Sequence, residues 1–172
     1  MTEMAEVRSP EEIRTVVDLA REIWTEHYVP IIGQAQVDYM LAGFQSEAAV
    51  ADQIREGYRY FVIRADGRPA GYLAVAADPS TRRMLLSKIY VLKSQRGRGL
   101  GRTAIACVEE LCRETGMEVL WLRVNKNNQD SIGVYERCGF VKTGVVVSDI
   151  GNGFVMDDFQ LEKRVRRVPA PA

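Results

Sequence analysis

The sequence has few of the residues that mark metal sites, disulfide scaffolds or membrane spans. Its 172 residues include three cysteines and a single histidine. Cys107, Cys112 and Cys138 are odd in number and have no metal-ligand spacing, which favours reduced thiols in a protein core. No apolar run approaches the ~20 residues of a membrane span, and the acidic first residues lack the apolar core of a signal peptide. A cytoplasmic protein without a metal is therefore expected.

Net charge is also lacking, because 23 Lys and Arg residues balance 23 Asp and Glu residues. A neutral chain has no bulk attraction to nucleic acid or to a membrane surface. The apolar content of 47% is ordinary for a globular protein. A chain of this length is expected to form one domain. We place that domain at residues 1–163 and expect a flexible tail at residues 164–172, basic at first and then rich in proline and alanine.

The most informative segment runs from Ile89 to Arg102. An apolar strand pattern leads into three alternating glycines and four cations, and then into an amphipathic helix. Glycine allows sharp turns and close approach of a ligand. A helix start presents unpaired N–H groups and the positive end of the helix dipole. The segment therefore predicts a site for an anion, and a polyphosphate fits best. Two common phosphate loops are excluded, because Arg102 stands where their spacing requires other residues.

A second informative block lies downstream. Residues 119–124 have the pattern of a strand, and residues 125–129 form a polar turn. A short helix is expected over residues 130–138, with Gly139 as its left-handed cap and Phe140 packed behind it.

Together the two blocks resemble the motifs of the GCN5-related N-acetyltransferases. The R-x-x-G-x-G pattern that begins at Arg96 is similar to the family's diphosphate loop, Q/R-x-x-G-x-G/A. The string from Asn128 to Phe140 is similar to the family's N-x-x-A-x-x-L-Y-x-x-x-G-F. It differs at Ser131 and Val134, where the family usually has Ala and Leu.

The resemblance covers roughly residues 84–163 and implies the family's α/β (α+β) acyl-CoA N-acyltransferase fold. That fold has a mixed, mostly antiparallel sheet with helices on both faces. The activity implied is transfer of an acetyl group from acetyl-CoA to an amine, on a small molecule such as a polyamine or amino acid, by direct attack in a ternary complex. A homodimer is left open. The cofactor-binding residues implied are Ile89, Tyr90, Val91, Arg96, Gly97, Arg98, Gly99, Leu100, Gly101, Arg102 and Asn128.

Asn128 and Tyr135 each have a purely structural alternative. Asn128 could cap the following helix, and Tyr135 could be a core tyrosine. The resemblance implies instead that Asn128 contacts the cofactor arm and that the Tyr135 hydroxyl lies near the cofactor sulfur. A phenol of pKa ~10 can protonate a thiolate of pKa ~8.5 with little penalty. We therefore hypothesise that Tyr135 is the general acid.

On the acceptor side, Trp24, His27 and Tyr28 are candidate substrate-binding residues, because aromatic rings can bind an amine through cation–π contacts. Trp24 could equally be a core residue, and a structural or surface role suits His27 better than a base. The general base is not identified, and six carboxylates are candidates: Glu26, Asp38, Asp78, Asp149, Asp157 and Asp158. Two other functions stay open, a protein or peptide N-acetyltransferase and a CoA-binding module without catalysis.

Periodicity and turn residues predict the remaining elements. A helix capped by Ser9 is expected to end before Pro30, and another runs from about residue 101 to 115 with Cys107 on its buried face. A right-handed crossover should make the strands around residues 84–92 and 119–124 parallel. Further helices are expected at residues 34–43 and 46–57, and further strands at residues 60–64, 71–76, 141–147 and 154–162.

Overall fold

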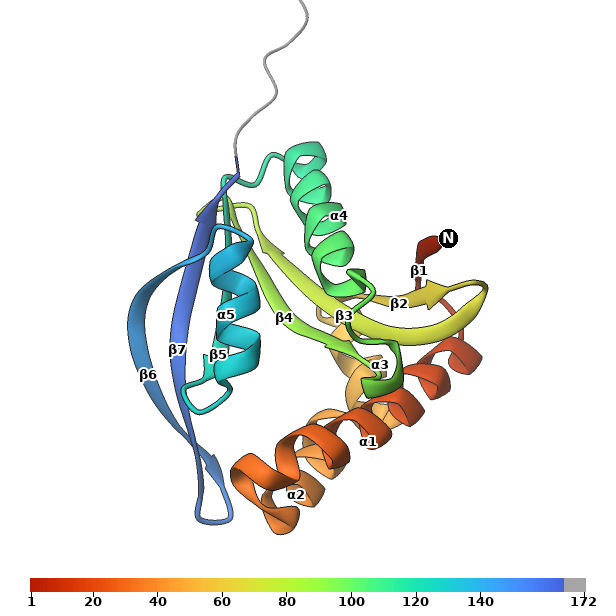
Figure 1. The fold of residues 1–172 in the computed structure, drawn as a ribbon, viewed down its shortest axis with the longest axis vertical. Helices are drawn as coiled ribbons and strands as arrows, with labels where there is room; N and C mark the ends of the chain where they lie inside the picture. The colour runs from red at the N-terminus through yellow and green to blue at the C-terminus, as the bar shows by residue number, and fades with distance from the viewer. Residues whose placement is uncertain (166–172) are drawn as a thin grey trace, which may run out of the picture. The chain divides into compact units, whose positions relative to one another are not determined.

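A computed structural model describes residues 1–165. The chain divides into two compact units, one made of Met1–Ala76 and Lys88–Ala104 and the other of Ala77–Ser87 and Ile105–Ala172. Hydrogen bonds order the strands of the described residues as β1-β2-β3-β4-β5-β7-β6 (Figure 1). The elements are β1 (Thr2–Glu6), α1 (Pro10–Ile32), α2 (Gln34–Phe44), α3 (Glu47–Arg55), β2 (Arg59–Ala65), β3 (Arg68–Asp78), β4 (Arg83–Val91), a 3-10 turn (Lys93–Gln95), α4 (Leu100–Thr115), β5 (Val119–Asn125), α5 (Gln129–Arg137), β6 (Val141–Gly151) and β7 (Phe154–Arg164).

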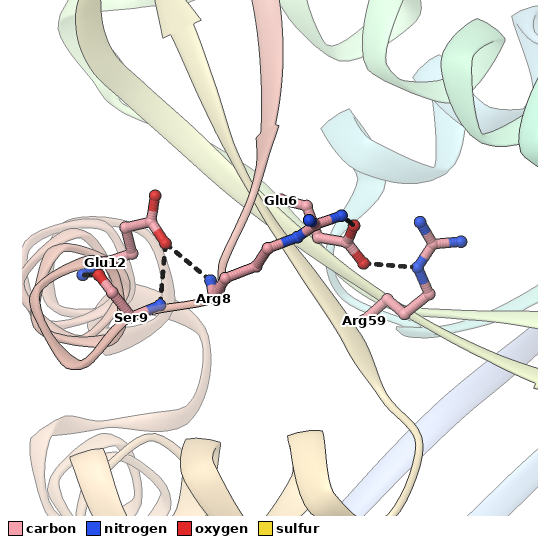
Figure 2. A network of polar contacts seen from close by, with 5 residues as sticks. All are labelled: Glu6, Arg8, Ser9, Glu12 and Arg59. Atoms are coloured by element: carbon pink, nitrogen blue, oxygen red, sulfur yellow. Dashed lines mark hydrogen bonds and ion pairs between the residues drawn. The ribbon is translucent and has the colours of Figure 1, made fainter.

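The first unit begins with a strand that the sequence analysis missed. β1 pairs antiparallel with β2, and Glu6 accepts hydrogen bonds from Arg8 and from Arg59 of β2 (Figure 2). Arg59 and Arg8 together lower the pKa of Glu6. The same view shows the predicted capping box, in which Ser9 Oγ accepts from the Glu12 N–H and Glu12 accepts from the Ser9 N–H. The Glu6–Arg59 contact therefore ties β1 to β2, and the capping box fixes the start of α1.

α1 is longer than its proline suggests. It continues through Pro30 to Ile32, so the prediction that it ends before Pro30 was wrong. Proline removes one helical N–H, but the Gly33 N–H donates to the Val29 carbonyl and closes the next turn. The buried residues on its core-facing side include Val16, Val17, Ala20, Ile23 and Trp24, all at most 8% exposed.

β2 and β3, which contain the strands predicted at residues 60–64 and 71–76, form a hairpin. Asp66 and Gly67 both have positive φ, at 51° and 77°, which is the geometry of a tight two-residue turn. Near the same end of β3, the Leu92 N–H donates to the Ala70 carbonyl. This bond brings the end of β4, which leads into the glycine-rich loop, against β3.

The second unit contains the predicted parallel pairing. Residues 83–85 of β4 pair with residues 119–121 of β5, and β7 pairs antiparallel with both β5 and β6. Figure 1 shows β6 and β7 as a long two-stranded ribbon. Leu120, Leu122 and Val124 of β5 are 6% exposed or less, with Leu161 of β7 at 1%. Alternate side chains of these strands therefore form one apolar, covered face.

Two expectations about this unit need correction. Cys107 is exposed, whereas Cys112 is buried, because the buried stripe of α4 runs through Ala104, Ile105 and Val108 and passes Cys107 by. At the C-terminal end, β7 includes Arg164, and the Val165 N–H donates to the Glu118 carbonyl. The ordered chain thus passes the expected boundary at residue 163, and the rest of the expected tail, residues 166–172, lies outside the described residues. Among the described helices, none is long and apolar enough to cross a membrane.

Candidate active site

The glycine-rich loop leaves a run of backbone N–H groups without acceptors. Before this run, the Arg96 N–H donates to the Lys93 carbonyl. After it, the Thr103 N–H donates to the Gly99 carbonyl. Within residues 1–165, the N–H groups of residues 97–102 make no backbone hydrogen bond. Gly97 and Gly99 both have φ of +78°, which L-residues with side chains rarely adopt. α4 begins at Leu100, so this run includes a helix N-terminus, as predicted.

The four cations of the loop divide into two pairs. Arg96 Nε donates to the Val91 carbonyl at 3.1 Å, and Arg98 forms an ion pair with Asp66 at 2.7 Å. Both arginines therefore brace the loop against its own unit. The N-terminal ammonium and Arg98 lower the pKa of Asp66 to about 2, so this brace is charged at neutral pH. Lys93 and Arg102 are exposed, and they form no ion pair with other described residues.

β4, the strand before the loop, pairs with its parallel neighbour β5 over only part of its length. Pairing between β4 and β5 ends at Leu85–Trp121, whereas β5 stays paired with β7 as far as Asn125. In the described structure, the backbone of β4 beyond Leu85 therefore lies outside the β4–β5 ladder. The predicted binding residues Ile89, Tyr90 and Val91 belong to that stretch.

The predicted substrate-binding aromatics meet one of these β4 residues. The Tyr90 ring lies 5.5 Å from Trp24 and 6.0 Å from Tyr28, centroid to centroid. The Tyr28 hydroxyl donates to the Tyr90 hydroxyl at 3.4 Å, and His27 packs edge-on against Tyr28. Trp24 is only 3% exposed, which makes it part of the core. Tyr28 and His27 are half-buried.

A buried polar network extends from this cluster, and the sequence analysis did not find it. Trp24 Nε1 is buried and makes no hydrogen bond in the described structure. Burial raises the pKa of the Tyr72 phenol, and the nearby Trp24 N–H partly offsets this rise. Gln45 Nε2 donates to the Tyr72 hydroxyl at 3.3 Å, and Gln45 Oε1 lies 3.3 Å from the Tyr60 hydroxyl. The Tyr60 hydroxyl donates its proton to Gln53 at the shorter distance of 2.7 Å. These residues come from α1, the end of α2, α3, β2 and β3, so no local motif signals the network.

Lys88 completes this network. Its Nζ donates to Gln53 Oε1 at 3.0 Å and lies over the rings of Tyr58 and Tyr60, at 5.7 and 5.4 Å from their centroids. Burial lowers the pKa of Lys88 to about 8. The charged ammonium is therefore less favourable in the folded protein than in the unfolded chain.

This burial predicts a pH-dependent effect of Lys88→Met on stability. The folded-state pKa of about 8 lies below the unfolded value, so the wild type gains stability as the pH rises through 8 toward 10. The variant has no such charge and should melt at a higher temperature than the wild type at pH 7, with the difference shrinking by pH 9.5. Thermal melts across this range test it, with exposed Lys93→Met as the control. A difference that does not change with pH would contradict the assignment.

At the end of β5, a tight turn places Asn128 before α5. The Asn128 N–H donates to the Asn125 carbonyl at 2.9 Å. Asn128 is 4% exposed, and its side chain makes no capping hydrogen bond to α5. The alternative that the Asn128 side chain caps α5 is therefore wrong.

Tyr135 lies near the C-terminal end of α5. Its ring packs edge-on against Phe140 at 5.8 Å, and Phe140 is 2% exposed. Gly139 has φ of 92°, so the predicted left-handed cap is confirmed. Tyr135 is half-buried, which holds the ring and leaves part of the side chain accessible.

The structure separates the six candidate carboxylates. Glu26, Asp38, Asp78 and Asp149 are exposed, and Asp157 forms an ion pair with Lys126. Asp158 alone among the six is buried, at 4% exposed. Burial raises its pKa, Arg123 lowers it and Asp157 raises it. No group of three or more potential metal-ligating side chains is found in the described part of the chain.

Comparison with known proteins identifies the family. The family model described as Acetyltransferase (GNAT) family matches residues 16–140. The chain belongs to this acetyltransferase family. Its sequence is 30% identical over 103 residues to streptothricin acetyltransferase of Streptomyces lavendulae, covering 60% of this chain and 54% of that protein. It is 30% identical over 108 residues to phosphinothricin N-acetyltransferase of Alcaligenes faecalis, covering 60% of this chain and 55% of that protein. The matches thus span about half the length of these two relatives.

The GNAT fold is confirmed by solved structures. The PaiA N-acetyltransferase of Thermoplasma acidophilum, solved in complex with coenzyme A, has a TM-score of 0.78 and 19% identity, and the match covers 95% of this chain and 99% of that one. The expected mixed, mostly antiparallel sheet of this acetyltransferase family is present in the strand order above.

Proposed function

We propose that this protein is an acetyl-CoA-dependent N-acetyltransferase that acts on an amine of a small molecule. The observation that carries the proposal is the run of N–H groups at residues 97–102, which have no acceptor among the described residues. Such a run at a helix start suits a diphosphate. An ideal Cβ at Gly97, Gly99 or Gly101 would meet no protein atom within 4 Å. A ligand can therefore approach the backbone there, and the donor set fits coenzyme A.

Each predicted residue has a task in this scheme. When bound, acetyl-CoA supplies the acetyl group as a thioester. The loop N–H groups hold the diphosphate, and the β4 backbone at Ile89–Val91 holds the pantetheine arm. Asn128 offers a buried amide to that arm, and the Tyr135 hydroxyl gives a proton to the departing sulfur. Trp24, His27 and Tyr28 belong to the acceptor side.

The named activities of the relatives support a small-molecule acceptor. Streptothricin and phosphinothricin, the substrates in the two relatives' names, are small molecules. The experiment is thiol release from acetyl-CoA over a panel of polyamines and amino acids, combined with calorimetry of coenzyme A binding. We expect binding heat and thiol release with at least one amine.

Each failure of this experiment has its own meaning. Binding heat without thiol release from any amine would contradict a small-molecule acetyltransferase and favour a CoA-binding module or a protein acetyltransferase. Mass spectrometry of host proteins with and without the enzyme separates those two. Absence of binding heat would contradict the whole proposal.

The division of the loop cations yields a prediction about affinity. Arg102→Gln should weaken coenzyme A binding about threefold to tenfold, because it removes a cation that pairs with no carboxylate among residues 1–165. Arg98→Gln should weaken it less, since Arg98 already pairs with Asp66. Calorimetry at two salt concentrations measures both, and the Arg102 effect should be larger at low salt. Equal losses in the two variants would contradict the division.

A further inference from the structure

β6 is the outermost strand of the second unit. In the described part of the chain its inner edge pairs with β7, and no strand pairs with its outer edge. Figure 1 shows β6 on the outer side of the long β6–β7 ribbon. A free edge presents a row of backbone N–H and C=O groups that another strand can bind, and charges or prolines commonly protect it. Residues 144–148 of β6, with the sequence GVVVS, contain neither.

The same stretch of β6 carries exposed valines. Val145 and Val147 are 63% and 66% exposed, and they lie opposite Phe159 and Asp157 of β7. Alternate residues of a strand share a face, so these positions belong to the face on which Leu161 of β7 is buried, at 1% exposed. The apolar face of the second unit therefore continues onto β6, where it is open to solvent.

A β-bulge sets the alternation of β6 before these valines. Lys142 and Gly144 pair with consecutive residues of β7, so Thr143 is the extra residue of the bulge. Lys142 consequently lies on the same face as Val145, although the two are three residues apart in the sequence. The position of Lys142 Nζ, 3.7 Å from the centroid of the Phe159 ring, agrees with this placement.

The exposed valines lie between a cation and an anion at equal distances. Counted along β7, the partners of Lys142 and Asp149 each lie three residues from the partner of Val146. Both side chains are exposed, and neither forms an ion pair within residues 1–165. Asp149 accepts a hydrogen bond from the Gly151 N–H at 2.8 Å. The exposed face of β6 thus has the order cation, valine, valine, anion.

We propose that β6 pairs antiparallel with β6 of a second copy of this chain, about a two-fold axis at Val146. Directly opposed residues of antiparallel strands share a face. In this register Val145 lies opposite Val147 of the second copy, and Lys142 lies opposite its Asp149. The two-fold axis repeats each of these contacts, so both charges of each copy gain a partner of opposite sign.

The order of residues favours a second copy over an unrelated extended peptide. Because the strand reads cation, valine, valine, anion, its own reversed sequence is the complement that an antiparallel neighbour must carry. Each copy has one β6, so the pairing closes as a dimer and leaves no free β6 edge for further growth. The pairing also covers the uncharged edge at residues 144–148, which would otherwise invite aggregation.

Reversal of one charge tests the pairing and its register. Analytical ultracentrifugation of the wild type, over about 1 to 100 μM, should show a species of twice the 19.3 kDa chain mass. Lys142→Asp and Asp149→Lys each place like charges opposite one another at both symmetric contacts. Each variant should therefore raise the dissociation constant at least about tenfold. The double variant, which exchanges the two charges, should restore the dimer.

An equimolar mixture of the two single variants shows that a weakened dimer does not come from misfolding. One variant carries only anions at the two positions and the other only cations, so the mixture should form a dimer that contains one chain of each. Glu114→Lys is the matched control, because Glu114 is an exposed residue of α4 and takes no part in the pairing. Its dissociation constant should equal that of the wild type.

Three results would overturn the proposal. The first is a wild type that stays monomeric at every concentration. The second is a dimer that neither charge reversal weakens, which would place the interface away from β6. The third is a mixture of the two single variants that stays monomeric, which would contradict the register at Val146.

None of these results bears on acetyl transfer, because the pairing involves none of the proposed cofactor-binding or catalytic residues.

Discussion

Replacing Tyr135 with phenylalanine is expected to lower turnover roughly tenfold to a thousandfold, while coenzyme A binds as tightly as in the wild type. The ring contact with Phe140 needs no hydroxyl, so the variant keeps the packing of α5. In the proposed scheme, what it loses is the donor of the proton to the departing sulfur. Coenzyme A leaves more easily as the neutral thiol than as the thiolate. A phenol of pKa ~10 can give the sulfur this proton, because the resulting thiol has a pKa of ~8.5.

Steady-state thiol release and calorimetry measure the two halves of this prediction. Tyr58→Phe is the control, because Tyr58 is also half-buried and belongs to none of the proposed binding or catalytic groups. Unaltered turnover in Tyr135→Phe would remove the general acid from the scheme. A loss of turnover matched by an equal loss of coenzyme A affinity would show that the hydroxyl acts in binding.

The second large effect is expected at Gly71, where β3 approaches β4 closely. An ideal Cβ at this position would overlap the Tyr90 carbonyl oxygen and lie 3.0 Å from Val91 Cα. Both neighbours are backbone atoms, so no side chain can swing away. Gly71→Ala should therefore force β3 away from the β4 residues that precede the loop, and we expect it to lower the free energy of unfolding by about 3 kcal/mol. For a chain of this size the melting temperature should fall by about 6–12 °C.

Gly43→Ala is the matched control for Gly71. Gly43 lies in α2, and a Cβ there would meet nothing within 4 Å. Alanine favours a helix over glycine, so this variant should be as stable as the wild type or slightly more stable. Equal melting temperatures for the Gly71 variant and the wild type would show that the two strands have room to separate.

The loop and the β5–α5 block could be predicted because their information is local. Alternating glycines, adjacent cations and an amphipathic helix follow one another within residues 89–115. Gly139 and Phe140 likewise mark the end of a short helix by their own chemistry. In both places the structure has the expected turn or cap.

Other features depend on partners that are distant in the sequence. β1 is short and carries two acidic residues, and its pairing with β2 provides the hydrogen bonds that make it a strand. Lys88 has no motif, and its burial depends on Gln53 and Tyr60. The burial of Asp158 next to the more exposed Asp157 also depends on the register of β7, because adjacent residues of a strand face opposite sides.

The central claim is that the backbone of residues 97–102 binds the diphosphate of coenzyme A. The most direct measurement compares, by calorimetry, the binding of coenzyme A with that of pantetheine, which has the same thiol arm and no diphosphate. We expect coenzyme A to bind and pantetheine to bind at least about 100-fold more weakly. Equal affinities for the two compounds, or no heat with coenzyme A, would contradict it.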